Sequence, residues 1–208
     1  MEKDIVNKNI LVVLSHLDDE IYVLGLMLKL KEEGYNIHFL TICGKGLLKD
    51  NKEDQLHRIN NYYNIINNHF TSDILDYNDL TLTYNTRHDD EFIKEKINHL
   101  INKHEIDTVV THYYNDMHSD HKKVSELVRV VCRPYVSRVK KLLGCYIPGN
   151  HQELNNFNTV VDISANIELI TTYAHNYNRL RHLPGYNNSA YFADNRAVEL
   201  YHLYYEKL

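Results

Sequence analysis

The sequence predicts an α/β fold with a Rossmann-like, mostly parallel sheet flanked by helices. A short, partly β-branched apolar run, Ile10–Leu14, precedes a segment with apolar residues at helical spacing, and a second apolar run, Ile37–Cys43, follows. The same order of strand, polar loop and helix returns over residues 108–132. Alternation of this kind is typical of parallel sheets connected by right-handed crossovers.

The elements follow from these patterns in chain order. Apolar residues at helical spacing from residue 21 to 28 predict a first helix, which Gly34 ends as a C-cap. Further helices are expected over about 53–67, 91–102, 121–132 and 164–180, and further strands near Ile74 and over 108–111, 142–147 and 159–163. The rest is interpreted as an aromatic tail ending at Leu208. Since no linker or repeat interrupts the pattern, one domain over residues 1–208 is expected.

The composition of the chain indicates which partners and which cellular location are expected. The formal net charge of -5 and a pI near 6.3 argue against nucleic acid. Cys43, Cys132 and Cys145 lack disulfide or zinc-finger spacing, which predicts a reducing, cytoplasmic location. The polar start of the chain and the short first apolar run predict neither a signal peptide nor a membrane span. A homo-oligomer is also considered, because residues 191–205 are rich in aromatic side chains suited to an interface.

Two polar loops follow predicted strands and carry most of the reactive side chains. The first reads Ser15-His16-Leu17-Asp18-Asp19-Glu20, and the second reads Asn115-Asp116-Met117-His118-Ser119-Asp120-His121. In open α/β sheets, ligands bind at the carboxyl ends of the strands, where such loops converge. The two loops are therefore expected to meet in one site.

These side chains match the donors of a catalytic zinc site, which usually has three His or carboxylate ligands and one open position. His16, Asp19 and His121 would supply that set, since Asp19 in the first turn of the next helix can converge with His16. His118 shares the same spacing with His121, so it is either a ligand or a catalytic partner. Mixed His and Asp donors also suit iron(II), cobalt or manganese, and zinc is the default.

The acidic neighbours have two interpretations. Asp18 lies between two candidate ligands and is available as a general base, and Asp120 is placed to hydrogen-bond an imidazole and fix its tautomer. Carboxylates at a helix start are also favoured by capping and by the helix dipole alone. Two His-rich acidic loops at matching strand ends favour the metal site over that simpler explanation.

The two segments resemble the LmbE-like, or PIG-L, family of N-acetylglucosaminyl deacetylases. The family signature is His-Pro-Asp-Asp-Glu after the first strand and Asp-x-His-x-Asp-His after a later one. This chain has residues 16–20 and 116–121 in the same order and spacing, with Leu17 in place of the proline. The resemblance covers most of the chain and implies a zinc-dependent N-deacetylase, a hydrolase of linear amides.

The resemblance also implies roles for particular residues. His16, Asp19 and His121 would bind the zinc, and Asp18 would be the general base. His118 would stabilise the oxyanion or protonate the leaving amine, with Asp120 setting its pKa and orientation.

Contacts with the sugar are expected from Arg58, Asp79 and Asp116. Arg58 stands where the family carries an arginine in its second helix, and Asp79 lies in the loop after the third strand. Asn61 replaces the acidic partner that this arginine often has in the family.

The expected reaction removes an N-acetyl group from a GlcNAc-type substrate, such as a glycoside or a nucleotide sugar. Asp18 would take a proton from metal-bound water, which attacks the amide carbonyl. The alternative is a non-catalytic α/β domain that binds a sugar or nucleotide. A nucleotide fits less well, because the first strand–helix turn lacks a Gly-x-Gly-x-x-Gly pattern and carries carboxylates that repel phosphate. A binding protein would need no general base.

Overall fold

The computed structural model describes residues 8–46, 52–147, 157–175, 191–193 and 196–207. The strands are β1 (Asn9–His16), β2 (Asn36–Cys43), β3 (Thr71–Ile74), β4 (Thr108–His112), β5 (Lys141–Cys145), β6 (Thr159–Asp162), β7 (Tyr191–Ala193) and β8 (Arg196–Glu206). They form one sheet in the order β3-β2-β1-β4-β5-β8-β6, with β7 paired to β8. The first five strands are parallel, whereas β8 runs antiparallel to β5, β6 and β7. The predicted α/β fold is confirmed.

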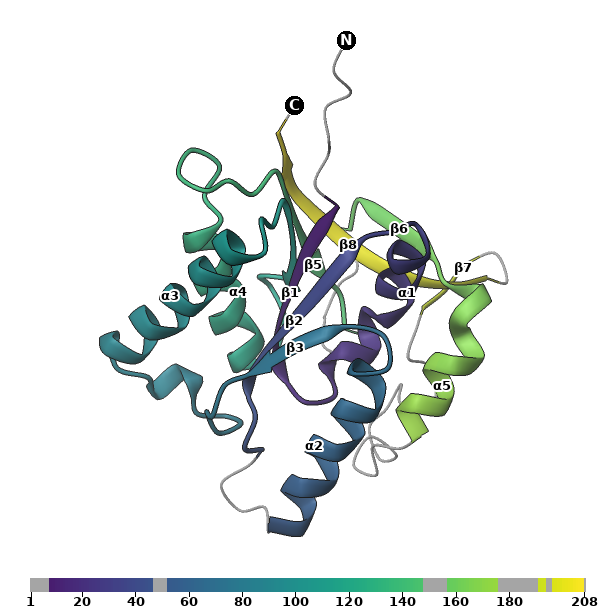
Figure 1. The fold of residues 1–208 in the computed structure, drawn as a ribbon, viewed down its shortest axis with the longest axis horizontal. Helices are drawn as coiled ribbons and strands as arrows, with labels where there is room; N and C mark the ends of the chain where they lie inside the picture. Colours follow the sequence, from purple (N-terminus) through teal and green to yellow (C-terminus); the bar gives the residue numbers. More distant parts are fainter. Residues whose placement is uncertain (1–7, 47–51, 148–156, 176–190, 194–195, 208) are drawn as a thin grey trace.

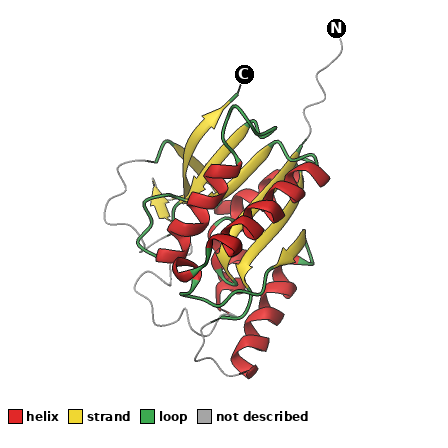
Figure 2. Ribbon diagram, turned by 90° about the vertical axis from the view of Figure 1, so that its left-hand side faces the viewer, coloured by secondary structure: helices red, strands yellow, loops and turns green. Residues whose placement is uncertain are grey.

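Helices cover both faces of this sheet. They are α1 (Leu24–Glu32), α2 (Lys52–Ile66), α3 (Arg87–Lys103), α4 (Ser119–Val131) and α5 (Ile167–His175), with short 3₁₀ turns η1 (Asp19–Tyr22), η2 (Leu82–Tyr84) and η3 (Ser164–Asn166). In Figure 1, α3 and α4 lie on one side of the sheet and α1, α2 and α5 on the other. Figure 2 shows the strands between these layers. No helix in the described ranges is long and apolar enough to cross a membrane.

The packing of β1 explains its continuous apolar sequence. Ile10, Val12 and Leu14 point into the core formed with α1, α2 and α5. Leu11 and Val13 point into the second core, which α3 and α4 complete. A strand buried on both faces needs apolar residues at successive positions, as the sequence predicts.

Element boundaries differ from the prediction where capping decides them. Helix α3 begins at Arg87 rather than near residue 91, because Thr86 and Asp89 form a capping box in which each side chain accepts the other's backbone N–H. Gly34 follows the end of α1 with φ of +87°, as its expected C-cap position requires. The predicted extension of the last helix towards residue 180 lies outside the described residues.

The C-terminal segment is the main error of the prediction. Instead of a tail, residues 196–206 form β8, which lies between β5 and β6 inside the sheet. Ala197 and Tyr201 belong to one core, and Val198 and Leu200 to a third cluster that includes Tyr113. Its enrichment in aromatic and apolar residues was a signal for a strand buried on both faces.

Strand β8 also holds the first turn of α1. The buried Glu199 accepts hydrogen bonds from the backbone N–H groups of Gly25 (2.8 Å) and Leu26 (2.9 Å) and from the Tyr201 hydroxyl (2.6 Å). It therefore satisfies donors that a helix start leaves without partners. A Cβ at position 25 would lie 2.3 Å from Ile163 Cγ2, so this close approach requires glycine.

We expect Glu199→Gln to change how stability depends on pH. Burial raises the pKa of Glu199 from 4.5 to about 7, although the Tyr201 hydroxyl and two backbone N–H groups act in the opposite direction. The folded protein therefore holds this proton more tightly than the unfolded chain. Its stabilising contribution is complete below pH 4.5 and is lost as the pH rises through 7.

Urea unfolding between pH 5 and 8 measures this contribution. The free energy of unfolding of the wild type, minus that of the variant, should fall across this range by on the order of 1–3 kcal/mol. Glu206→Gln is the control, because its half-exposed carboxylate lies at the far end of the same strand. A difference that stays constant with pH would contradict the expectation.

Candidate metal centre and active site

The two polar loops meet at the carboxyl edge of the sheet, as the sequence predicts. His16 ends β1, and its neighbour in the pairing register is Cys43 at the end of β2. The second loop follows β4 and places His118 and His121 at the start of α4. Parallel strands thus bring residues about a hundred positions apart in the sequence into direct contact.

Three donor groups at this edge have the spacing of zinc ligands. His16 Nδ1 lies 3.2 Å from His121 Nε2. Asp19 contacts both rings through different oxygens, with Oδ2 3.3 Å from His16 Nδ1 and Oδ1 3.4 Å from His121 Nε2. Zinc with tetrahedral bonds of 2.0–2.1 Å places its ligand atoms about 3.3–3.4 Å apart. All three side chains are buried. The donor set therefore fits a divalent transition metal.

Other donors lie close to the same point. His118 forms a possible trio with His16 and His121, and His112 forms one with Asp19 and His121, with donor atoms within 4.8 Å of one another. Both trios share residues with the set of His16, Asp19 and His121, so they describe one centre. The structure thus leaves His118 and His112 beside the centre without requiring them as ligands.

Asp116 orients His121. Its Oδ2 lies 2.9 Å from His121 Nδ1, and its Oδ1 accepts the backbone N–H of His118 at 2.7 Å. The side chain is fully buried, so the expected contact of Asp116 with a sugar is not what this geometry favours. The hydrogen bond directs the Nε2 lone pair of His121 towards the metal position.

Asp120 orients His16 in the same way, and the Asp79 carboxylate lies beside the same ring nitrogen. Asp120 Oδ2 lies 3.2 Å and Asp79 Oδ1 lies 3.1 Å from His16 Nε2, on the side of the ring away from Asp19. Asp120 Oδ2 also accepts the backbone N–H of Leu80 at 2.7 Å. The sequence-based expectation that the Asp120 carboxylate sets the orientation of His118 therefore needs correction, because that carboxylate faces His16.

His118 is held by a backbone group instead. The Asp120 N–H donates to His118 Nδ1 at 3.3 Å, which places the proton of a neutral ring on Nε2. Burial lowers the pKa of His118, and the nearby His121 and His16 lower it further. A neutral His118 is thus a hydrogen-bond donor through Nε2.

Asp18 has a strained backbone at the centre of the first loop. Its φ is 151°, a conformation that residues other than glycine rarely adopt. Its N–H donates to Glu20 Oε2 at 2.9 Å, and Arg58 Nη2 contacts both Leu17 O (3.4 Å) and Asp18 Oδ2 (3.3 Å). These contacts fix the carboxylate although the backbone is strained.

The carboxyl group of Asp18 is also suited to proton transfer. Burial raises its pKa to about 6, although the Arg58 guanidinium acts in the opposite direction. About 18% of the side chain remains exposed, so water and substrate can reach it. A group with a pKa near neutrality exchanges protons efficiently at neutral pH.

Arg58 and Asp79, the other expected sugar contacts, line the same region. Arg58 Nη1 lies 3.8 Å from Asp79 Oδ2, and only about a tenth of each side chain is exposed. Arg58 also contacts Asp18, and Asp79 lies beside His16. Their contact with a sugar stays a prediction.

His112 and Glu20 are site residues to which the sequence analysis gave no role. His112 ends β4, and its ring stacks on that of His121 at a centroid distance of 3.9 Å and an interplanar angle of 3°. Its Nε2 accepts the backbone N–H of Ser15 at 2.9 Å, and burial together with His121 lowers its pKa to about 4. The sequence did contain a signal for this role, because His112 directly follows the strand predicted over residues 108–111.

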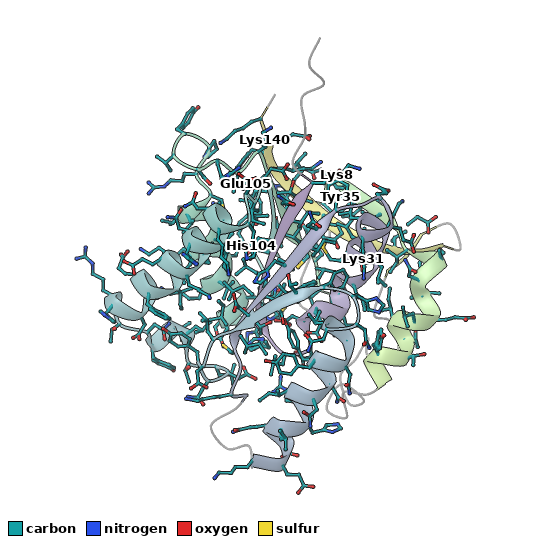
Figure 3. The ribbon with its side chains drawn as sticks, in the orientation of Figure 1. Lys8, Lys31, Tyr35, His104, Glu105 and Lys140 are labelled. Atoms are coloured by element: carbon teal, nitrogen blue, oxygen red, sulfur yellow. The ribbon has the colours of Figure 1, made fainter. Side chains whose placement is uncertain are left out.

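A cavity of about 680 Å³ lies elsewhere, at the amino ends of β1, β2 and β3. Figure 3 labels residues at this opposite edge, including Lys8 before β1, Tyr35 before β2 and Glu105 before β4. The cavity is lined by lysine, histidine and asparagine side chains and includes none of the site residues above. The reactive cluster and this cavity are therefore separate features.

Several solved structures share the fold. The A40926 pseudoaglycone deacetylase Dbv21 is 16% identical with a TM-score of 0.69, and the match covers 93% of this chain and 96% of that one. The N,N'-diacetylchitobiose deacetylase of Pyrococcus horikoshii is 16% identical with a TM-score of 0.66, over 94% and 83% of the two chains. GalB, the 4-carboxy-2-hydroxymuconate hydratase of Pseudomonas putida KT2440, is 14% identical with a TM-score of 0.68, over 96% and 97%. At these identities the likeness shows the fold alone.

Comparison of the sequence with protein families gives more specific information than the shared fold. No curated protein gives a significant match. The family model for GlcNAc-PI de-N-acetylase, PIG-L, matches residues 11–132, a segment that contains both polar loops and every site residue described above. Since this segment is more than half of the chain, the protein belongs to the PIG-L family.

Proposed function

We propose that residues 1–208 form a single PIG-L deacetylase domain that removes the N-acetyl group from an amino sugar in a metal-dependent reaction. The observation that carries this proposal is the contact of His16 Nδ1 with His121 Nε2 at 3.2 Å and of the two Asp19 carboxylate oxygens with these nitrogens at 3.3 and 3.4 Å, with Asp18 next to Asp19 in the chain. Membership of the PIG-L family and the deacetylases of the same fold support the substrate class. The cytoplasmic location and the homo-oligomer stay predictions.

His16, Asp19 and His121 would hold the ion, and zinc is the metal that we propose for them. A divalent ion bound there would polarise the acetyl carbonyl and lower the pKa of water at its open position. Asp116 fixes the tautomer of His121, while Asp120 accepts from His16 Nε2 and the Asp79 carboxylate lies 3.1 Å from the same nitrogen. These contacts involve the ring nitrogens that point away from Asp19. The other two nitrogens, His16 Nδ1 and His121 Nε2, can therefore each donate a lone pair to a metal.

Asp18 is the proposed general base. Its Oδ2 is engaged by Arg58, which leaves Oδ1 to accept a proton from the attacking water. His118 Nε2–H is the proposed donor to the oxygen that becomes negative when the amide carbon turns tetrahedral. A neutral His118 would have to become an imidazolate to give up its Nε2 proton, so Asp18 returns the proton that it took from water to the leaving amine. Acetate and the free amine are the products.

Acetate release from a panel of N-acetylglucosamine derivatives tests the function. We expect release by the purified protein, loss of release after chelation, and recovery when zinc is added back, since the donor set needs an ion for its chemistry. Metal analysis of the same samples shows whether the centre is filled. A filled centre without acetate release on any substrate would contradict the proposal and favour another reaction of this fold, such as the hydration that GalB is named for.

Asp18→Asn should keep the metal and lose turnover. The amide is close in shape but cannot accept the proton, and general base catalysis contributes about 10²–10⁴-fold. We expect kcat to fall by that factor with unchanged zinc content. Asp76→Asn is the matched control, because this carboxylate near the same sheet edge is 80% exposed and pairs with Lys45. Near-normal turnover of zinc-loaded Asp18→Asn would remove Asp18 from this role.

Asp116→Asn should weaken metal binding rather than substrate binding. Loss of a carboxylate that orients a metal-binding histidine typically costs about 10–100-fold in metal affinity. We expect this loss in a competition titration against a chromophoric chelator, with KM unchanged once the centre is saturated. His121→Ala gives the limiting case of a removed ligand. If KM rises while metal affinity stays the same, Asp116 contacts the sugar, as the sequence suggested.

A further inference from the structure

A second group of metal donors lies on the other side of the His16 ring. His16 Nε2, Cys43 Sγ and Asp120 Oδ2 come from the ends of β1 and β2 and the first turn of α4, and all three side chains are buried. The Nε2–Oδ2 distance is 3.2 Å and the Sγ–Oδ2 distance is 4.0 Å. Around a tetrahedral zinc ion, these distances would be about 3.3 and 3.6 Å. Small side-chain shifts would bring the three donors onto one ion.

The charged groups around His16 Nε2, Cys43 Sγ and Asp120 Oδ2 favour the binding of a cation. Asp79 Oδ1 lies 3.1 Å from the same imidazole nitrogen and offers a fourth donor. The second carboxylate oxygen of Asp120 is buried and accepts no hydrogen bond from any residue that the structure describes. Buried carboxylates are costly unless they are paired or bind a metal. A thiol among them selects soft ions such as zinc or cadmium over magnesium or calcium.

We propose that His16 Nε2, Cys43 and Asp120 form a second position for a thiophilic divalent ion, and that an ion there inhibits the enzyme. A neutral imidazole has one lone pair, so His16 can serve only one of the two positions at a time. When Nε2 binds the second ion, the ring proton moves to Nδ1, which faces Asp19 at 3.3 Å. Cys43 loses its thiol proton to solvent. The first position thereby loses a ligand.

Cadmium titration of the 208-residue protein tests occupancy directly. Binding should produce one equivalent of thiolate-to-cadmium charge-transfer absorption in the ultraviolet and release the Cys43 proton. The band should be lost in Cys43→Ser and kept in Cys132→Ser and Cys145→Ser, whose buried, unpaired cysteines are the matched controls. A wild type without the band, or a Cys43→Ser variant that retains it, would overturn the proposal. If Cys43→Ser does not fold, Cys43→Ala gives the same comparison.

The inhibitory effect rests on the proposed deacetylase function, whereas the absorption band does not. In acetate-release assays, cadmium in excess of the first equivalent should inhibit wild type, and the inhibition constant should be at least tenfold weaker for Cys43→Ser. Cys132→Ser and Cys145→Ser should respond as wild type does. Equal inhibition of Cys43→Ser and wild type would overturn the inhibitory role. Failure of the deacetylase proposal would instead appear as absent acetate release with the band unchanged.

Discussion

The buried imidazole of His16 is the interaction on which the rest of the site depends. One ring nitrogen faces Asp19 and His121, and the other faces Asp79 and Asp120. Through these contacts a single side chain connects the loops that follow β1, β3 and β4. A change in its tautomer or orientation would affect both sides at once. The position of the ring is set by β1, the central strand that is buried on both faces.

The site buries several carboxylates close together, which is unfavourable in free energy, and neighbouring groups of the fold compensate for this. Several carboxylates lie within a few ångströms of one another, and burial alone would make each unfavourable. The imidazoles and the Arg58 guanidinium pair with them, and Leu80 adds a backbone N–H. Two non-glycine residues with positive φ, Asp18 and Leu80, lie beside these groups. Strain at such positions is typical of sites where geometry matters more than stability.

Sequence reasoning reached the parallel part of the sheet and the meeting of the two polar loops because local patterns determine both, whereas the metal-binding role of His16, Asp19 and His121 stays a prediction. Continuous apolar runs identified the parallel strands, and strand order placed His16 and His121 at one edge. The partners of Asp116 and Asp120 could not be predicted in this way, because each carboxylate lies within reach of more than one imidazole. Only the three-dimensional packing shows that Asp120 contacts His16 and that Asp116 contacts His121.

The missed strand β8 shows how a distant segment supports the site. The loop from His16 to Glu20 leads through η1 into α1, so the position of Asp19 depends on where that helix begins. Glu199 fixes this start by accepting the N–H groups of Gly25 and Leu26. Because β8 pairs with β5 and β6, the carboxylate is anchored to the sheet rather than to a loop. The C-terminal strand is therefore part of the framework that holds the first polar loop in register with the second.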